Sequence, residues 1–356
     1  MSHPTALAVY TYAGGFSLGV QQAGFDVLAH FEDKYGVKTA ALNFPKIDIR
    51  SPRSSWNPKD YAGKIDFVFA NPPCAVFSRS SMRPGRGLNT HQEDPRTACY
   101  EHIYDVVKIV RPRVFAIESV SEALTRGAAV IRHLADRAER FGYNITLLTV
   151  NAARHGVPQN RKRFFFIGHT FQRVDFINPG LTDVTVRQAL VEVLPQTFPT
   201  LTPYALDIRK MVRVMPKTGG KVRNYFERLR KHGDKRALQF KLPGFFPRSI
   251  DPDSVGPVVI GVSEWFHPNG NVFSLEEFKA LCGFPHSFVF PESHGHTQRI
   301  QLLARGLAPP VAKYVSAQIL KGLKKKDVKA ALRAVDMTSG EPREYDWEPL
   351  EVDPLG

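Results

Sequence analysis

Apolar residues between positions 6 and 170 alternate between short continuous runs and stretches with helical spacing. The runs are short enough for buried strands and are rich in β-branched and aromatic residues. They occupy Ala6–Tyr10, Val27–Phe31, Ile65–Ala70, Val114–Ile117, Ile145–Val150 and Phe164–Gly168. Between them, apolar positions three or four residues apart predict helices over Ser17–Ala23, Tyr100–Val110 and Ala128–Phe141. This alternation of strands and helices predicts an α/β fold with a doubly wound, mostly parallel sheet.

The alternating pattern ends near residue 170. Residues 171–262 are rich in Pro, Gly and single charges, and neither period persists in them. Helical spacing returns at Leu275–Cys282 and Pro310–Leu323. We therefore expect a first domain, an irregular region, a return to the first domain and a tail, over residues 1–170, 171–262, 263–323 and 324–356. The tail is basic at first and acidic from Glu341, and we expect it to be mobile.

Charge indicates the class of partner. The 356 residues include 48 Lys and Arg against 34 Asp and Glu, a net charge of +14, which favours a polyanion such as nucleic acid. Between Arg209 and Lys241, twelve basic residues accompany two acidic ones, with Tyr225, Phe226 and Phe240 interleaved. Such a segment suits phosphate contacts and base stacking, although a solvated basic surface has the same composition.

Cysteine usage and hydropathy indicate the compartment. Cys74, Cys99 and Cys282 are too few and too scattered for a disulfide framework, which fits a reducing cytoplasm. No apolar run reaches membrane-spanning length, and the residues from Met1 have no signal-peptide pattern. We expect a soluble, cytoplasmic protein that makes no membrane contact, and we predict no metal site.

A cysteine follows one of the predicted strands. The strand ending at Ala70 is succeeded by Asn71, Pro72 and Pro73, and prolines cannot continue a buried strand because they lack the N–H donor. Cys74 is thus delivered to the carboxyl edge of the sheet, where open α/β sheets bind ligands. A thiol held there is a candidate nucleophile. Taken alone, the stretch equally fits a half-buried loop cysteine.

A glycine turn follows the first predicted strand. Its residues Ala13, Gly14, Gly15 and Phe16 precede a predicted helix, so that the backbone and helix N–H groups approach a ligand. The acidic residues Glu32 and Asp48 follow the next apolar segments. The first is placed to bind ribose hydroxyls and the second to accept from an adenine amine. Either carboxylate also fits an ordinary solvated surface.

Further charged residues are predicted at the same edge. Glu118 follows the strand that ends at Ile117, and a low-dielectric site there would raise its pKa and make it a proton donor at neutral pH. Arg161 and Arg163 precede the last predicted strand and alternate onto one face. Two guanidinium groups at a crevice suit a phosphate or a base carbonyl.

The order of these features resembles the cytosine-5 DNA methyltransferase family over about residues 6–320. The motifs follow the family order: the glycine turn at 13–19, Glu32, Asp48, Pro72-Pro73-Cys74, Glu118-Ser119-Val120, Gln159-x-Arg161-x-Arg163, the basic segment, residues 275–285, and Gly306–Pro310. Each motif is modest, but the ordered set is specific. The resemblance implies a Rossmann-like S-adenosylmethionine-dependent methyltransferase fold with a smaller, irregular target-recognition domain over 171–262.

The resemblance also implies a mechanism. A cytosine flipped out of double-stranded DNA would be attacked at C6 by Cys74, while Glu118 binds N3 and Arg163 binds the base carbonyl. Arg161 would serve the loop or a phosphate. S-adenosylmethionine would contact Tyr10, Tyr12, Ala13, Gly14, Gly15, Phe16, Glu32, Asp33, Asp48, Ile49, Asn71, Pro72 and Arg305. The implied setting is a monomeric restriction-modification enzyme of a bacterial or phage-type cytoplasm.

Four positions depart from the family pattern. Tyr12 stands where the turn usually has a glycine, Ala75 where a Gln usually follows the nucleophile, Ser119 in place of Asn, and Arg305-Gly306 in place of the glycine-asparagine start of the last motif. A phenol and a guanidinium near the methionine end of the cofactor suit an extra anionic group. Two donors therefore stay open, ordinary S-adenosylmethionine and a carboxylated form that would give 5-carboxymethylcytosine.

Other classes remain as alternatives. A non-catalytic DNA-binding protein would keep the basic segment but would not need Cys74, Glu118 and Arg163 together. An RNA-directed relative also fits the short recognition segment. A zinc deaminase is suggested by His91-x-Glu93 but is rejected, because no Cys-x-x-Cys follows.

Overall fold

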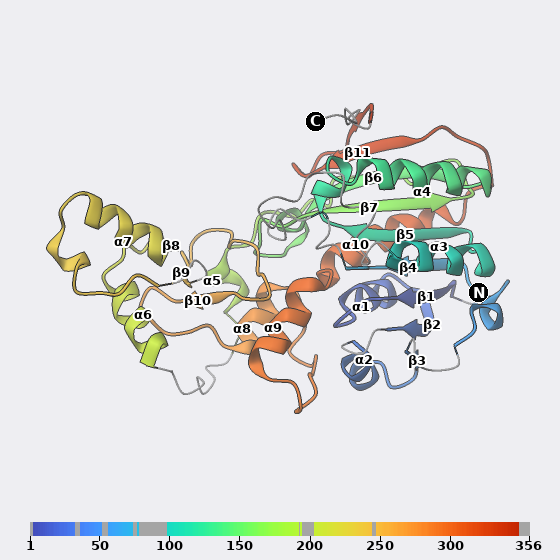
Figure 1. The fold of residues 1–356 in the computed structure, drawn as a ribbon. Helices are drawn as coiled ribbons and strands as arrows, with labels where there is room; N and C mark the ends of the chain where they lie inside the picture. The colour runs from blue at the N-terminus through green and yellow to red at the C-terminus, as the bar shows by residue number, and fades with distance from the viewer. Residues whose placement is uncertain are drawn as a thin grey trace. The chain divides into compact units, whose positions relative to one another are not determined.

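The computed structural model divides the chain into two compact units (Figure 1). It describes residues 3–32, 36–51, 56–73, 77, 98–191, 193, 203–243 and 247–348. The first unit comprises Met1–His155, Arg161–Thr182 and Gly306–Gly356, and the second comprises Gly156–Asn160 and Asp183–Arg305. The predicted return to the first domain at residue 263 differs from this division, in which the first unit resumes at Gly306.

The first unit is built on a sheet of nine strands among the described residues, in the order β12-β11-β6-β7-β5-β4-β1-β2-β3. The strands are β1 (Thr5–Val9), β2 (Asp26–Phe31), β3 (Asp48–Arg50), β4 (Phe67–Ala70), β5 (Val114–Ser119), β6 (Asn144–Asn151), β7 (Lys162–His169), β11 (Arg333–Met337) and β12 (Arg343–Tyr345). Only β7 and β12 run antiparallel to their neighbours. The predicted mostly parallel sheet is confirmed.

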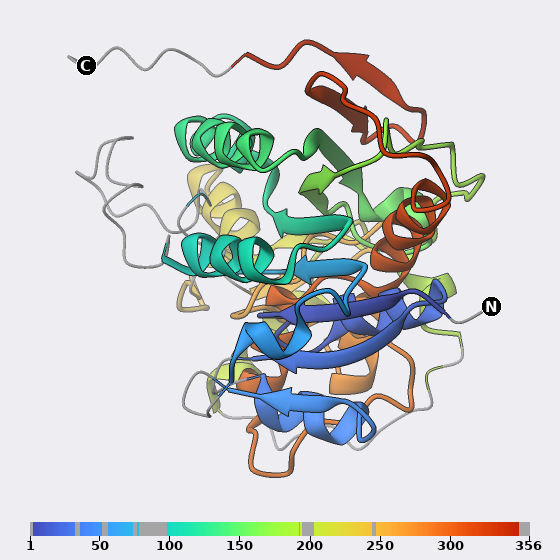
Figure 2. The same ribbon diagram turned by 90° about the vertical axis from the view of Figure 1, so that its right-hand side faces the viewer.

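Helices cover both faces of this sheet. They are α1 (Gly15–Gln22), α2 (Val37–Asn43), α3 (Ala98–Val110), α4 (Ala128–Arg140) and α10 (Pro309–Gly322), with 3₁₀ turns η1 (Pro58–Tyr61), η5 (Ser121–Leu124) and η6 (Ala152–His155). Figure 2 shows α3 and α4 on one face and α10 on the other. Helix α10 packs closely on α1, because a Cβ at Gly19 would lie 2.6 Å from the backbone oxygen of Pro309.

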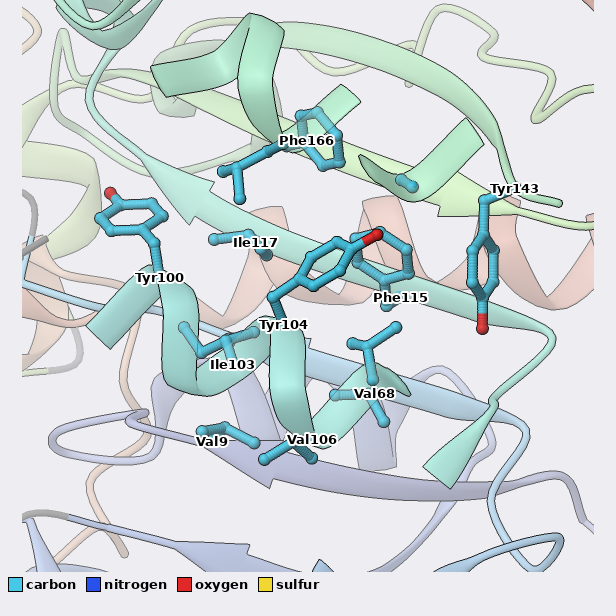
Figure 3. Packing of buried hydrophobic residues seen from close by; sticks show 14 of the residues in the cluster. Val9, Val68, Tyr100, Ile103, Tyr104, Val106, Phe115, Ile117, Tyr143 and Phe166 are labelled. Carbon is cyan, nitrogen blue, oxygen red and sulfur yellow. The ribbon is translucent and has the colours of Figure 1, made fainter. Parts of the chain in front are cut away.

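The apolar face of α3 forms the centre of the core. Ile103 and Val106 are fully buried, and they point toward Val68 and Ile117 of the adjacent strands (Figure 3). The ring of Phe115 on β5 stacks on Phe166 of β7 at 5.9 Å. Burying each such side chain contributes about 1.5–3 kcal/mol, so this core holds the central strands in one register.

Strand register brings the ends of β1, β4 and β5 to the same edge. Ala70 lies opposite Val9 on one side and Ile117 on the other. The residues that follow on these strands, Asn71 and Glu118 among them, therefore emerge together. Strand β7 runs the other way, so its first residues reach this edge as well.

The structure corrects the predicted mobility of the tail over residues 324–348. Strand β11 pairs in parallel with β6, and β12 pairs with β11, so residues 333–345 extend the sheet. The guanidinium of Arg113 donates to the backbone oxygens of Leu323 and Lys325 and pairs with Asp327, which fixes the connection from α10. The strand was missed because its apolar residues are few and stand between charged ones.

The second unit holds a small sheet in the order β10-β9-β8. Its elements are β8 (Gly220–Lys221), β9 (Pro247–Ser249), β10 (Glu264–Phe266), α5 (Val186–Ala189), α6 (Pro203–Arg213), α7 (Val222–Lys231), η7 (Lys235–Ala237), α8 (Leu275–Leu281) and α9 (His296–Arg305). Buried Trp265 contacts the rings of Phe273 and Phe278, which explains why α8 belongs to this unit.

The basic segment of the second unit is more regular than its sequence indicates. Helices α6 and α7 carry closely spaced charges, but their apolar residues form a small core of their own that includes Met211, Val222 and Phe226. Phe226 is fully buried against Phe240, so its predicted role as a base-stacking residue is corrected. Among the described residues of the whole chain, no helix is long and apolar enough to cross a membrane.

Candidate active site

Glu118 is the centre of the candidate site. It is the last residue but one of β5 and only 1% exposed. The Nε atom of Arg163, on β7, lies 2.7 Å from its Oε1. Asn71, directly after β4, donates its Nδ2–H to Oε2 at 2.5 Å. A buried carboxyl group is thus held between a guanidinium and an amide at the edge where the strands end.

This environment sets the proton affinity of the carboxyl group. Burial raises the pKa of Glu118 to about 7, against the opposing effects of Arg163, Arg161 and the Asn71 hydrogen bond. Desolvation therefore outweighs two nearby positive charges. A group with a pKa near neutrality exchanges a proton at physiological pH, as a general acid or base requires.

The two arginines of the predicted pair have different surroundings. Arg163 keeps its side chain 11% exposed and reaches Glu118. Arg161 is 4% exposed and donates Nη2–H to the backbone oxygen of Gly306 at 3.1 Å. The structure therefore brings Arg163 to the carboxyl group, and it ties Arg161 to the loop before α10.

The third residue of that motif, Gln159, belongs to the second unit. It is buried, its Nε2 donates to the backbone oxygen of Leu281, and its Oε1 accepts from the backbone N–H of Val259 at 2.9 Å. Alternate residues of one short segment thus anchor different units.

The predicted nucleophile Cys74 lies outside the described residues, as do Asp33 and Ala75. The chain is described up to Pro73, and strand β4 ends at Ala70 as the prolines predicted. Pro72 is buried beside Asn71.

The glycine turn has an unusual backbone. Tyr10 and Tyr12 have φ values of +58° and +54°, in the left-handed region that favours glycine, and Gly14 has +85°. Tyr12 replaces the glycine of the family pattern, yet it keeps the backbone conformation that a glycine allows. Its side chain is 7% exposed. Ala13, Gly15 and Phe16 are buried, and α1 begins at Gly15.

Glu32 is fully buried at the end of β2 and holds this turn in place. Its Oε1 accepts from the backbone N–H of Thr11 at 2.6 Å and from the Thr11 hydroxyl. A Cβ at Gly36 would lie 2.6 Å from Oε2, so only glycine fits beside this carboxylate. The interpretation of Glu32 as a solvated surface residue is therefore wrong.

Asp48, by contrast, is exposed at the start of β3. It pairs with Arg50 at 2.7 Å and accepts from the hydroxyl of Tyr61 at 3.1 Å. Ile49 beside it is half-buried.

An aromatic cluster at this edge was missed in the sequence. The Tyr10 hydroxyl and Nδ1 of His102 are 2.8 Å apart. The Phe31 ring lies 4.2 Å from that of Trp56 and 5.0 Å from that of His102. The sequence feature that could have predicted this cluster is Trp56, one of three tryptophans, which follows Asp48 by eight residues.

Arg305 is exposed as the last residue of α9. It belongs to the second unit, whereas Tyr12 belongs to the first. Their predicted proximity to one end of the cofactor stays a prediction.

The second unit contains a pocket of about 360 Å³. One wall of the pocket is a row of three residues that lie opposite one another on β8, β9 and β10, namely Lys221, Arg248 and Trp265. Pro257, Val258, Ile260 and Ser263 complete the lining. Burial lowers the pKa of Arg248 below its usual range. Among the described residues, neither of the two cationic side chains has a hydrogen-bond or ion-pair partner.

Comparison with known proteins decides the family. The profile described as C-5 cytosine-specific DNA methylase matches residues 6–321. The chain belongs to this family. The predicted resemblance is confirmed, and the chain is an enzyme of the DNA cytosine-5 methyltransferase type.

Individual relatives agree with this membership. The chain is 28% identical over 338 residues to the Type II methyltransferase M1.HphI of Haemophilus parahaemolyticus, covering 89% of this chain and 87% of the relative. The methyltransferase EhMeth of Entamoeba histolytica has a similar fold, with a TM-score of 0.65 at 14% identity over 91% of this chain and 100% of that one. The S. pombe Dnmt2 methyltransferase has a TM-score of 0.56 at 16% identity, over 90% and 98%.

Proposed function

We propose that this methylase transfers a methyl group from S-adenosylmethionine to C5 of a cytosine in double-stranded DNA, through covalent addition of Cys74 to C6. The observation that carries the proposal is the buried Glu118, held between Arg163 and Asn71 directly beside the Pro72-Pro73 segment. An acid that is neutral near pH 7 can donate a hydrogen bond to the ring nitrogen of a base. Because the base is stacked in the duplex, it must first be flipped into the site.

The described residues Glu118 and Arg163 support the part of the addition that takes place on the base. As the thiolate of Cys74 forms a bond to C6, the electron pair of the C5–C6 double bond is displaced and negative charge develops toward N3. The proton of Glu118 would stabilise that charge, and the Arg163 guanidinium beside it would bind the base carbonyl. After C5 has been alkylated, a base accepts the C5 proton, the electron pair of that C–H bond re-forms the C5–C6 double bond, and the C6–S bond breaks to release the thiolate.

The edge of the first unit fits the cofactor. The turn at Tyr10 and Tyr12 has a left-handed backbone, Glu32 directly follows the carboxyl end of β2, and Asp48 lies on the adjacent strand β3. Open α/β sheets bind nucleotides beside the carboxyl ends of their strands. The Trp56 and Phe31 rings offer an apolar wall for a purine. When bound, S-adenosylmethionine supplies the electrophilic methyl group.

The second unit suits the DNA. Its pocket presents Lys221 and Arg248, whose side chains have no partner within the part of the chain that the structure describes, and cations of this kind bind phosphates or guanine edges. The target-recognition role predicted for residues 171–262 thus extends, in this proposal, to the whole second unit.

A carboxylated donor is the second candidate. Two departures from the family pattern support this donor. Tyr12 brings a phenol to a position where the family usually has a glycine, and Arg305 carries an exposed guanidinium. The product would then be 5-carboxymethylcytosine.

Mass spectrometry of nucleosides tests both candidates. DNA from cells that express the wild-type protein should contain 5-methylcytosine, and DNA from cells with Cys74→Ser should not. A heavier carboxymethyl adduct in the wild type alone would favour the second donor. If DNA from cells with the wild-type protein contained neither modified nucleoside, that result would contradict the proposed reaction.

A further inference from the structure

Asn71 donates a hydrogen bond to Glu118, and the reaction proposed above assigns no role to this bond. Asn71 was predicted to contact the cofactor, but the structure gives its Nδ2–H to Oε2 of Glu118. The asparagine is fully buried, and its backbone N–H bonds to the oxygen of Val9 on β1. Both its main chain and its side chain are therefore fixed by neighbouring strands.

Strand register explains why these two side chains meet. Ala70 and Ile117 are opposite each other in the parallel pair β4 and β5, so the next residues, Asn71 and Glu118, lie side by side. Ser119 comes next on β5, and its hydroxyl lies 3.0 Å from that of Tyr100 on α3. No other described side chain offers Oε2 a hydrogen bond.

The two oxygens of Glu118 are not equivalent. Oε2 accepts a hydrogen bond from the amide. Oε1 is buried and ion-paired with Arg163 at 2.7 Å, but it receives no aligned hydrogen bond from any described residue. A neutral carboxyl group carries its proton on the oxygen whose acceptor capacity is not already used. The proton therefore belongs on Oε1, and in the proposed reaction Arg163 would release this oxygen in order to bind the base carbonyl.

We propose that Asn71 is the positioning residue of Glu118, fixing the plane of the carboxyl group and directing its acidic proton to Oε1. This inference rests on the proposed function, since it concerns how the same acid meets the cytosine. It assigns to Asn71 a role in proton placement in place of the predicted contact with the cofactor.

The pH dependence of turnover distinguishes this role from a structural one. The charged groups that act on Glu118 among the described residues are Arg163 and Arg161, and both favour the carboxylate, as does the Asn71 amide. Because activity requires the neutral acid, kcat should fall as pH rises through the pKa of Glu118. Loss of the amide donor should raise that pKa and move the alkaline limb upward by about one to two pH units.

Two variants test the proposal on the full-length protein. Asn71→Leu removes the donor and keeps the number of side-chain heavy atoms, and Asn71→Asp places a second carboxyl group beside Glu118. We expect kcat to fall about ten- to a hundredfold in each, with the alkaline limb raised and the dissociation constant of S-adenosylmethionine unchanged. Thr146→Val, which removes a buried hydroxyl 3.0 Å from His169, is the matched control. It should leave the limb in place.

The outcomes separate the possible explanations. Weaker S-adenosylmethionine binding with an unchanged pH limb would overturn the inference and return Asn71 to the cofactor site. An unchanged limb with normal cofactor binding would overturn it as well. If one variant fails to fold by thermal unfolding, the other decides. Failure of the wild-type protein itself to methylate DNA would instead refute the proposed function.

Discussion

At the scale of single residues, Glu118 combines burial with charge. A carboxyl group that is 1% exposed would be costly as an unpaired anion, and its ion pair with Arg163 offsets only part of the desolvation. The remaining imbalance keeps a proton available near neutral pH. A functional group of this kind is expected to reduce the stability of the fold.

The stability of the fold should therefore depend on the protonation of Glu118. Its pKa is 4.5 when unfolded and about 7 in the folded protein, so the folded state binds more protons between those values. The free energy of unfolding should decrease as pH rises from about 4.5 to 7, by about 3 kcal/mol in total. Glu118→Gln should lack this component. Denaturant unfolding of both proteins at pH 5 and pH 8 measures this component. If the free energies of unfolding of the wild type and Glu118→Gln differed by the same amount at both pH values, the prediction would be contradicted.

Tyr12 gives a second prediction at this scale. Its φ of +54° is tolerated by glycine and costs a β-branched residue most. Tyr12→Gly should keep S-adenosylmethionine binding, whereas Tyr12→Val should weaken it about five- to thirtyfold, because about 1–2 kcal/mol of backbone strain is added. Calorimetric titration of both variants measures this. Equal affinities would show that the backbone of the turn does not position the cofactor.

At the scale of elements, strands and helices were predicted correctly where a single hydrophobic period dominates the sequence. The core strands and helices α1, α3 and α4 were found within two residues of their predicted ends, because their apolar residues are continuous or evenly spaced. Helices α6 and α7 were missed because dense charges hide their few apolar positions. Glu118, Arg161 and Arg163 were predicted at the sheet edge from strand ends. The bond from Asn71 depends on the register of β4 with β5, which the sequence alone does not reveal.

The edge strand β11 leads to a prediction about the end of the chain. Truncation after Leu323 removes the partner of β6 and the buried residues Ala334, Val335 and Met337. Their burial contributes on the order of 5 kcal/mol, so the unfolding midpoint should fall by about 5–10 °C. Truncation after Glu348 leaves β11 and β12 in place and should change little. A thermal scan in which both proteins match the full chain would contradict a structural role for this segment.

At the scale of the whole molecule, the catalytic and the basic features belong to different units. The first presents the acid, the arginine and the left-handed turn, and the second presents a basic row beside a pocket. The net charge of +14 adds long-range attraction for DNA.

DNA binding should depend on the basic row. We expect Lys221→Gln and Arg248→Gln each to weaken duplex binding and to reduce the slope of log K against log salt concentration by about one when a phosphate contact is lost. Arg187→Gln is the matched control, because Arg187 is exposed in the same unit but already paired with Asp253 at 2.6 Å. Equal effects of all three substitutions would show that only net charge matters.

Covalent trapping tests the central claim most directly. Duplex DNA that contains 5-fluorocytosine cannot lose the substituent at C5, so an enzyme that adds a thiolate to C6 stays attached after the transfer. We predict a denaturation-resistant adduct for the wild-type protein with S-adenosylmethionine, and none for Cys74→Ser. Peptide mapping should place the attachment at Cys74. An adduct that persists in Cys74→Ser, or no adduct from an active wild-type protein, would contradict the proposed mechanism.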